Sequence, residues 1–212
     1  MLALYFGGIL VGILVALVLK NTAFKGNPVP FVMELPNYRF PSAKSVVLLM
    51  WEKAKDFLTR AFTVIFMATV IIWFMQTFDT RLNVVENSAD SILAALGRLV
   101  SPIFAPLGFG DWRMVTALVS GFTAKEAVVS TFGVILGVST EQLGIALHSL
   151  FTTASAASFL AFCLLYTPCV AAVSTIKTEL KSGWKTVGIV FAQCLVAWLA
   201  AFMVYHVGLL LT

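Results

Sequence analysis

The sequence predicts an all-α membrane protein with about four membrane-crossing helices. Hydrophobic side chains make up 60% of the 212 residues and charged ones only 11%, and the mean hydropathy is +0.97. No single water-soluble core buries that much apolar surface, so the expected solvent is the bilayer. A helix of about 19 residues reaches roughly 28 Å, close to the hydrocarbon thickness. Four stretches without a formal charge are therefore candidate spans: Met1–Leu19, Ala61–Phe78, Gln142–Ile176 and Thr186–Tyr205.

The basic residues predict how these spans are oriented. Seven of the fourteen Lys and Arg residues lie between positions 20 and 60, and three more lie between 177 and 185. By the positive-inside rule both loops face the cytoplasm, which leaves residues 79–113 outside. The same clustering argues against nucleic acid as a partner, because that would require a basic stripe or patch on one face.

A charged pair marks the stretch Met114–Val138 as unusual. The chain must cross an odd number of times between the external loop and Lys177, yet two apolar stretches intervene. Lys125 and Glu126 lie in the middle of the first of them, where a lipid-facing helix would be strongly disfavoured. We therefore expect this stretch to be a re-entrant helical hairpin with a protein-buried tip, and Gly121 and Gly133 allow breaks in it.

The second stretch, Gln142–Ile176, is expected to be a span broken at Pro168. The residues from Pro168 to Ile176 cover only about 13 Å as a helix, which is too short to cross a membrane. A long arm to Thr167 and a short arm to Lys177 would fit, because proline removes one backbone donor. Many transporters build a substrate site from such a broken helix and a facing element.

Two amphipathic helices are expected at the membrane surface. Apolar residues recur at helical spacing between positions 47 and 58, which predicts a helix on the cytoplasmic surface that leads into the second span. Ser88 is the expected cap of a short external helix. Ile92, Leu96 and Leu99 share one face of that helix, and Pro102 is expected to end it.

Candidate metal ligands flank the predicted break. Cys163 and Cys169 lie on either side of it, thiolates suit ferrous iron, and an interrupted backbone offers carbonyl oxygens. The alternative is that both cysteines are small apolar packing residues, and the residues alone leave this open. Glu126 would attract the cation and Lys125 would hold the tip, unless the two form a purely structural pair. The Ser120 hydroxyl would help to dehydrate an ion, although serine also joins membrane helices.

Enzymatic activity is not expected of this chain. The sequence contains no Gly-x4-Gly-Lys-Ser/Thr phosphate loop. It also offers no recognisable set of nucleophile, base and orienting group.

Four segments, in this order along the chain, resemble FeoB, the ferrous iron transport protein B family: Phe31–Pro41, Trp51–Ala61, Gly121–Thr131 and Leu165–Ala172. The resemblance implies that residues 1–41 are the end of a FeoB C-terminal-type domain with a cytoplasmic loop. It implies that residues 42–212 form a Gate-type, nucleoside-transporter-like domain. It also implies Fe(II) uptake across the bacterial cytoplasmic (inner) membrane. In that setting Cys163, Cys169, Lys125 and Glu126 match the proposed gate positions.

The resemblance also implies partners. GTP hydrolysis would belong to a FeoB-type GTPase and N-terminal membrane half, on a separate chain or on a missing part. A FeoA-like cytosolic protein, the lipid bilayer and further copies of the chain are the other expected partners, and no stably bound cofactor is expected. Two rival functions remain at this stage, a Gate-family transporter of another solute such as a nucleoside, and a non-transporting remnant or scaffold.

Overall fold

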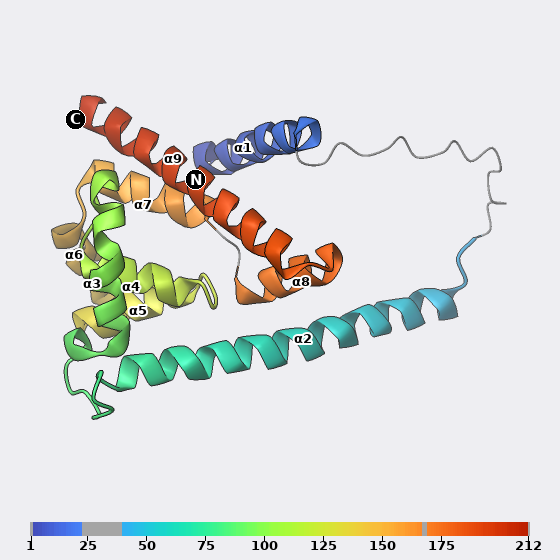
Figure 1. Ribbon diagram of the computed structural model, residues 1–212, viewed down its shortest axis with the longest axis horizontal. Coiled ribbons are helices and arrows are strands. Elements are labelled where there is room, and N and C mark those ends of the chain that lie inside the picture. The colour runs from blue at the N-terminus through green and yellow to red at the C-terminus, as the bar shows by residue number, and fades with distance from the viewer. Residues whose placement is uncertain (1, 23–39, 167–168, 212) are drawn as a thin grey trace. The chain divides into compact units, whose positions relative to one another are not determined.

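The computed structural model describes residues 2–22, 40–166 and 169–211 (Figure 1). Within these residues the chain is helical, and the β-type pairing is a single bridge between Phe78 and Val84. The all-α prediction is confirmed. The chain divides into two compact units, residues 1–58 and 59–212, which are described separately below.

The first unit contains α1 (Leu2–Asn21) and the beginning of α2 (Ala43–Thr77). The predicted first helix is confirmed. The helix expected to lie on the membrane surface is not a separate element, because α2 runs without interruption from this segment into the predicted second span. Its 35 residues extend about 52 Å, well beyond the roughly 30 Å of hydrocarbon that a bilayer offers. Charged residues in its first half therefore need not enter the lipid.

The segment after α2 contains three short elements: η1 (Ser88–Asp90), α3 (Ile92–Phe104) and η2 (Ala105–Leu107). The predicted cap is wrong, because Ser91 rather than Ser88 caps α3, its Oγ accepting the Ala94 N–H at 3.1 Å. Pro102 does not end the helix either. It lies in the last turn of α3, where proline removes a single backbone hydrogen bond.

The face that α3 buries also differs from the prediction. Leu93, Ala94 and Gly97 are buried, whereas Leu96 and Leu99 are exposed in the chain as described. Gly97 lets α4 approach closely, since a Cβ there would overlap the Thr116 side chain. The small residue therefore determines which face of α3 packs against α4.

The predicted hairpin consists of α4 (Trp112–Gly121) and α5 (Ala127–Leu136), which pack against each other. Residues 122–126, here called the tip, join them and include Lys125 and Glu126. Gly133 lies inside α5, so no break occurs there. The expected protein-buried tip is not seen within the described residues, because Phe122, Lys125 and Glu126 are exposed. How deeply this hairpin enters a membrane stays a prediction.

The predicted broken span is observed as α7 (Thr153–Leu165) and α8 (Val170–Leu180). The break lies at the expected place, although Thr167 and Pro168 themselves are outside the described residues. The expected long arm is wrong in one respect, because a second break at Phe151 and Thr152 separates α6 (Thr140–Leu150) from α7. Thr152 begins α7 with a capping box, in which its side chain and that of Ser155 each bond the other residue's backbone N–H.

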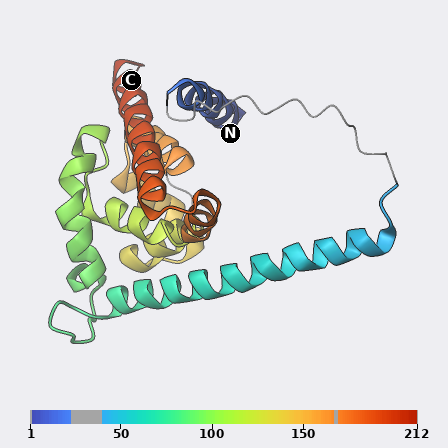
Figure 2. The same ribbon diagram turned by 45° about the vertical axis from the view of Figure 1, so that its right-hand side comes forward.

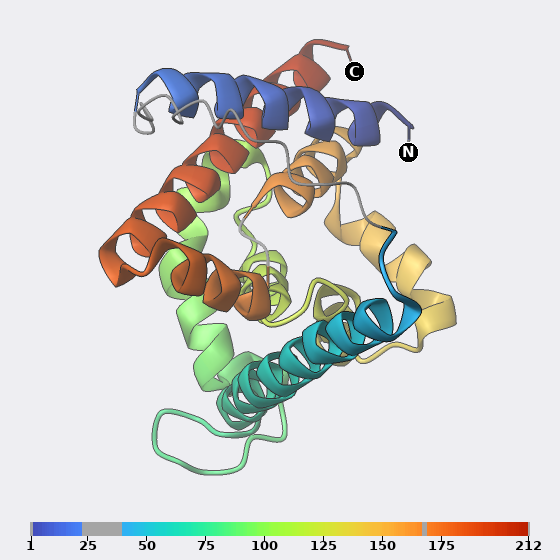
Figure 3. The same ribbon diagram turned by 90° about the vertical axis from the view of Figure 1, so that its right-hand side faces the viewer.

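The last helix, α9 (Gly183–Leu211), confirms the predicted final span and packs along α7 (Figures 1 and 2). The buried Ser158 Oγ on α7 donates to the Ala201 carbonyl at 2.9 Å. Trp198 Nε1 donates to the Ile103 carbonyl at 3.0 Å and so connects α9 to α3. α8 turns back beside the start of α9 (Figure 3).

Three helical segments within the described residues are long and apolar enough to cross a membrane, namely α2, α7 with α8, and α9. The number rises to five if two bent pairs each count as one span. One pair is α3 and η2 with α4, and the other is α5 with α6. The predicted number of about four stays a prediction. The predicted first span is not among these segments, because the described apolar part of α1, Tyr5–Asn21, is shorter than the others.

Candidate functional site

The tip of the hairpin lies against the break between α7 and α8. Lys125 Nζ donates to the carbonyl oxygens of Cys163 at 2.9 Å and Leu164 at 3.3 Å, which belong to the last turn of α7. The N–H of Val170, the first residue of α8, donates to the Phe122 carbonyl at 3.0 Å. Residues about 40 positions apart in the sequence therefore form one junction.

The carbonyls at the end of α7 need an external donor. The last four carbonyls of an α-helix have no partner within the helix, and they form its negative end. Proline carries no N–H, so Pro168 could not donate to Leu164 four residues earlier. The Lys125 ammonium supplies both charge and donors here, and hydrogen bonds from a charged group contribute about 1.5–3 kcal/mol.

The start of α8 has the opposite requirement. The first N–H groups of a helix have no acceptor within it and form its positive end. Cys169 occupies the N-cap position, but its side chain makes no capping hydrogen bond. The Phe122 carbonyl accepts from Val170 instead. The tip thus supplies a cation to one half-helix and a carbonyl to the other.

Tyr166 completes the junction. Its ring lies 5.1 Å from Lys125 Nζ, within the range of a cation–π interaction. Its hydroxyl is buried and has no hydrogen-bond partner among the residues that the structure describes. A Cβ at Gly121 would lie 2.7 Å from this hydroxyl and would overlap the Val128 side chain. Gly121 is the last residue of α4 and has no positive φ, so close packing rather than backbone conformation requires glycine here.

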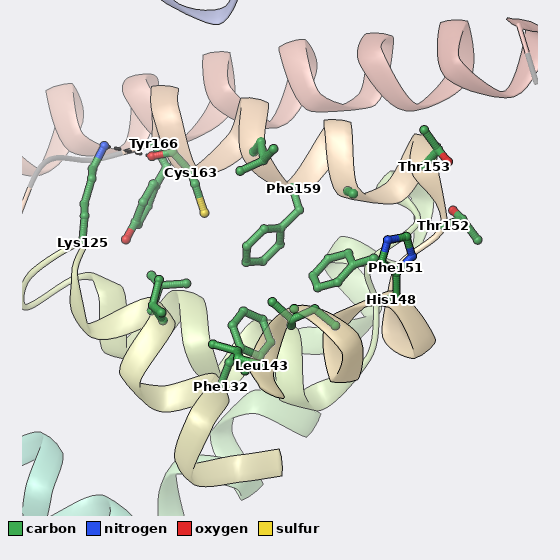
Figure 4. Close-up of a pocket in the computed structure, with 16 residues that line it drawn as sticks. Lys125, Phe132, Leu143, His148, Phe151, Thr152, Thr153, Phe159, Cys163 and Tyr166 are labelled. Atoms are coloured by element: carbon green, nitrogen blue, oxygen red, sulfur yellow. Dashed lines mark hydrogen bonds between the residues drawn. The ribbon is translucent and has the colours of Figure 1, made fainter. Parts of the chain in front are cut away.

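A cavity of about 610 Å³ extends from this junction between α5, α6 and α7 (Figure 4). Its walls are mainly apolar and include the aromatic rings of Phe132, Phe151 and Phe159. Its polar groups gather at two ends. Lys125, Cys163 and Tyr166 lie at one end, and His148, Thr152 and Thr153 lie at the other (Figure 4).

Two family models match the chain. The model described as Ferrous iron transport protein B C terminus matches residues 1–53, and the model described as Nucleoside recognition, named Gate, matches residues 58–183. The chain belongs to the FeoB family. It corresponds to the C-terminal membrane part of that family.

Curated relatives agree with this placement. The chain is 39% identical to the Fe(2+) transporter FeoB of Staphylococcus aureus strain COL, over 98% of the chain and 31% of that protein. It is 31% identical to the Fe(2+) transporter FeoB of Methanocaldococcus jannaschii, over 99% of the chain and 32% of that protein. It is also 33% identical to a Fe(2+) transport protein A/Fe(2+) transporter FeoB fusion protein of Porphyromonas gingivalis, over 98% of the chain and 30% of that protein.

The chain therefore spans about a third of the length of these FeoB relatives. No solved structure matches it. The first family model ends at residue 53 and the second begins at residue 58. The resemblance noted in the sequence implies a domain boundary between residues 41 and 42. That boundary stays a prediction.

The two cysteines predicted for this FeoB site occupy different positions at the junction. Cys163 is half-buried and lines the cavity, while Cys169 is half-buried at the start of α8. Pro168 lies outside the described residues.

The remaining predicted residues lie on the hairpin. Glu126 is exposed beside Lys125, at the N-terminus of α5, and makes no hydrogen bond or ion pair within the described part of the chain. Ser120 is fully buried, and its Oγ lacks a partner there too. Across residues 2–22, 40–166 and 169–211, no three His, Cys, Asp or Glu side chains form a group able to hold a metal ion. The joint metal site stays a prediction.

Two groups at the junction were not expected from the sequence. Tyr166 carried a usable signal, because it is an aromatic residue with a polar end placed two positions before the helix-breaking Pro168. The Phe122 carbonyl carried none, since every residue has a backbone carbonyl and no sequence pattern names its partner.

Proposed function

We propose that this chain forms part of the Fe(II) permeation path of a ferrous iron transporter in a bacterial cytoplasmic membrane. The observation that carries the proposal is the junction between the tip and the broken helix. Irregular backbone and charged groups at membrane depth are unfavourable unless they line a cavity or a substrate path. The names of the FeoB relatives, which call them Fe(2+) transporters, support iron as the solute.

In this mechanism the chain's own residues act in sequence on a hydrated Fe(II) ion. The exposed Glu126 carboxylate attracts the cation to the tip, and hydroxyl groups such as that of Ser120 replace part of its water shell. Carbonyl oxygens at the break and the thiols of Cys163 and Cys169 then pass the ion on. Carbonyl and thiol ligands suit this borderline metal, and no redox step is required.

The same proposal assigns orientation and partners. The basic segments 20–60 and 177–185 face the cytoplasm by the positive-inside rule. GTP hydrolysis belongs to a FeoB-type GTPase, acting on the first part of α2 around Trp51. The fusion named for the Porphyromonas gingivalis relative supports a FeoA-like partner.

Iron uptake by cells that depend on this chain, together with its GTPase partner, tests the site. We expect Cys169→Ser and Glu126→Gln each to reduce ⁵⁵Fe(II) uptake, while Glu179→Gln, which changes an exposed carboxylate in the last turn of α8, keeps it. Full uptake in both site variants would reject the assignment. A chain that neither captures a GTPase nor moves metal would instead be a non-transporting scaffold.

A second candidate is transport of an organic solute such as a nucleoside. The favouring observation is the apolar cavity, whose volume of about 610 Å³ lies in the range of small-molecule sites and whose aromatic walls could stack on a base. The description of the matching Gate model, Nucleoside recognition, points the same way. Competition separates the two. If iron is the solute, excess nucleoside leaves the chain-dependent Fe(II) uptake unchanged, whereas chain-dependent nucleoside uptake without Fe(II) uptake would favour the second candidate.

A further inference from the structure

The Lys125 ammonium occupies a position built for a cation. Two backbone carbonyl oxygens, those of Cys163 and Leu164, accept from its Nζ at 2.9 and 3.3 Å. The face of the Tyr166 ring lies 5.1 Å from the same nitrogen. The negative end of the α7 dipole adds a third source of attraction. Each of these groups would also attract a metal cation.

Two hydroxyl groups elsewhere at the junction lack a partner of their own. The Tyr166 hydroxyl and the Ser120 Oγ are both buried, and neither has a hydrogen-bond partner among the described residues. The Cys163 side chain lines the cavity at this end (Figure 4). The residue that provides one of the two carbonyls therefore also provides a thiol on the cavity side.

The lysine is also able to leave. Its side chain is exposed, and it extends from the tip between α4 and α5 rather than from α7 itself. A flexible side chain on a surface turn can release two hydrogen bonds without unfolding a helix. The acidic neighbour on the tip, Glu126, is exposed and makes no hydrogen bond or ion pair with any described residue. It offers the released ammonium a nearby opposite charge.

We propose that Lys125 is a tethered cation that holds the Cys163 and Leu164 carbonyls until the transported metal ion displaces it. The two carbonyls are then a metal-binding subsite, and the lysine holds the last turn of α7 to the tip when no metal is present. The proposal rests on the proposed Fe(II) transport and adds a specific exchange to it. No covalent bond forms or breaks, since one cation replaces another.

Anaerobic Fe(II) binding to the full chain in lipid nanodiscs measures the competition. Lys125→Met removes the ammonium but keeps a long side chain, whereas Lys125→Arg keeps the charge and the donors. If the site is occupied by the lysine most of the time, its removal raises the apparent Fe(II) affinity by about tenfold or more. Lys125→Arg should bind as wild type does. Unchanged or weaker binding by a folded Lys125→Met variant overturns the proposal.

Amine acylation of the wild-type chain distinguishes displacement from simple charge repulsion. An N-hydroxysuccinimide ester is added with and without Fe(II), and modification of each lysine is read by mass spectrometry. Lys125 should react several-fold faster when Fe(II) is bound, while the exposed Lys177 on α8 should not change. This readout needs no variant, so a Lys125→Met chain that fails to fold leaves the test intact.

The outcomes separate the two proposals. Fe(II) binding without any change in Lys125 acylation overturns the exchange and leaves Fe(II) transport standing. The absence of Fe(II) binding in wild type and in both variants overturns the exchange and removes the support for transport as well.

Discussion

The two helix breaks in the stretch Gln142–Ile176 differ in which groups hydrogen-bond to the free backbone groups at the helix ends. We call a break closed by the groups that make these bonds. The break between α6 and α7 is closed locally, by Thr152 and Ser155 three residues apart. The break between α7 and α8 is closed from a distance, by Lys125 and by the Phe122 carbonyl. A break whose hydrogen bonds are all local keeps its geometry, because Thr152 and Ser155 cannot separate while α7 stays folded. A break closed by another element opens when that element moves, which suits a gate.

The largest loss of stability is expected at Gly121, where the hairpin packs most tightly against Tyr166. In Gly121→Val the new side chain would collide with Tyr166 and Val128, so the free energy of unfolding should fall by about 3 kcal/mol. Gly188→Val on α9 is the matched control, because a Cβ there meets no atom within 4 Å. Thermal or denaturant unfolding in nanodiscs measures both. Equal stability of the two variants would contradict the packing at the junction.

A smaller loss of stability is expected when the Lys125 ammonium is removed from the break between α7 and α8. Lys125→Met leaves the Cys163 and Leu164 carbonyls without their donor, which should lower the free energy of unfolding by about 2 kcal/mol. Lys125→Arg retains charge and donors and should lose less than half of that. The same unfolding measurement applies, and a Met variant as stable as wild type would show that these bonds do not form.

The local hydrogen bonds at the break between α6 and α7 should contribute less to stability than the Lys125 bonds do. Thr152→Ala removes the cap of α7 and should cost about 1 kcal/mol of unfolding free energy. Ser139 occupies the same position before α6 but makes no capping hydrogen bond through its side chain. Ser139→Ala should therefore change stability by less than about 0.5 kcal/mol. Comparable losses in the two variants would mean that the Thr152 cap contributes nothing of its own.

The smallest effect belongs to an exposed turn after α2. The backbone N–H of Asn83, followed by that of Arg81, holds the pKa of Asp79 below its usual value of 3.8. A lowered pKa means that the charged carboxylate stabilises the turn above the unfolded value, and that this is lost as the pH falls through the folded pKa. Amide exchange of Arg81 and Asn83 should therefore lose protection below about pH 3.8.

Asp79→Asn supplies the control for this titration, because the amide oxygen still accepts a hydrogen bond but does not ionise. Its exchange protection should not follow the pH through this range, apart from the intrinsic rate. The same pH-dependent loss in both proteins would assign the effect to another group.

Features set by residues close together in the sequence were predictable. Apolar length gave α1, α2 and α9, the charged pair marked the turn at Lys125 and Glu126, and Pro168 marked the α7–α8 break. The α6–α7 break was missed although its signal was present. Thr152 is a residue type that commonly caps helices, but the absence of charge suggested one continuous helix.

Features set by distant residues were not predictable in the same way. The sequence indicated that the hairpin and the broken helix belong to one site, but the acceptors of Lys125 are backbone carbonyls, which no side-chain pattern identifies. The bond from Val170 to Phe122 joins two backbone groups 48 positions apart. α4 ends at Gly121, where a break was expected, but the sequence did not show that a Cβ there would lie 2.7 Å from the Tyr166 hydroxyl.

Solid-state NMR of the chain in lipid tests the central claim most directly. With ¹⁵N at Lys125 Nζ and ¹³C at the carbonyls of Cys163 and Leu164, dipolar recoupling measures whether the ammonium lies at the end of α7. We predict a measurable coupling to both carbonyls, consistent with Nζ–O distances of 2.9 and 3.3 Å, and loss of that coupling on addition of a diamagnetic divalent metal. An ammonium with no measurable coupling to either carbonyl, in the absence of metal, would contradict it.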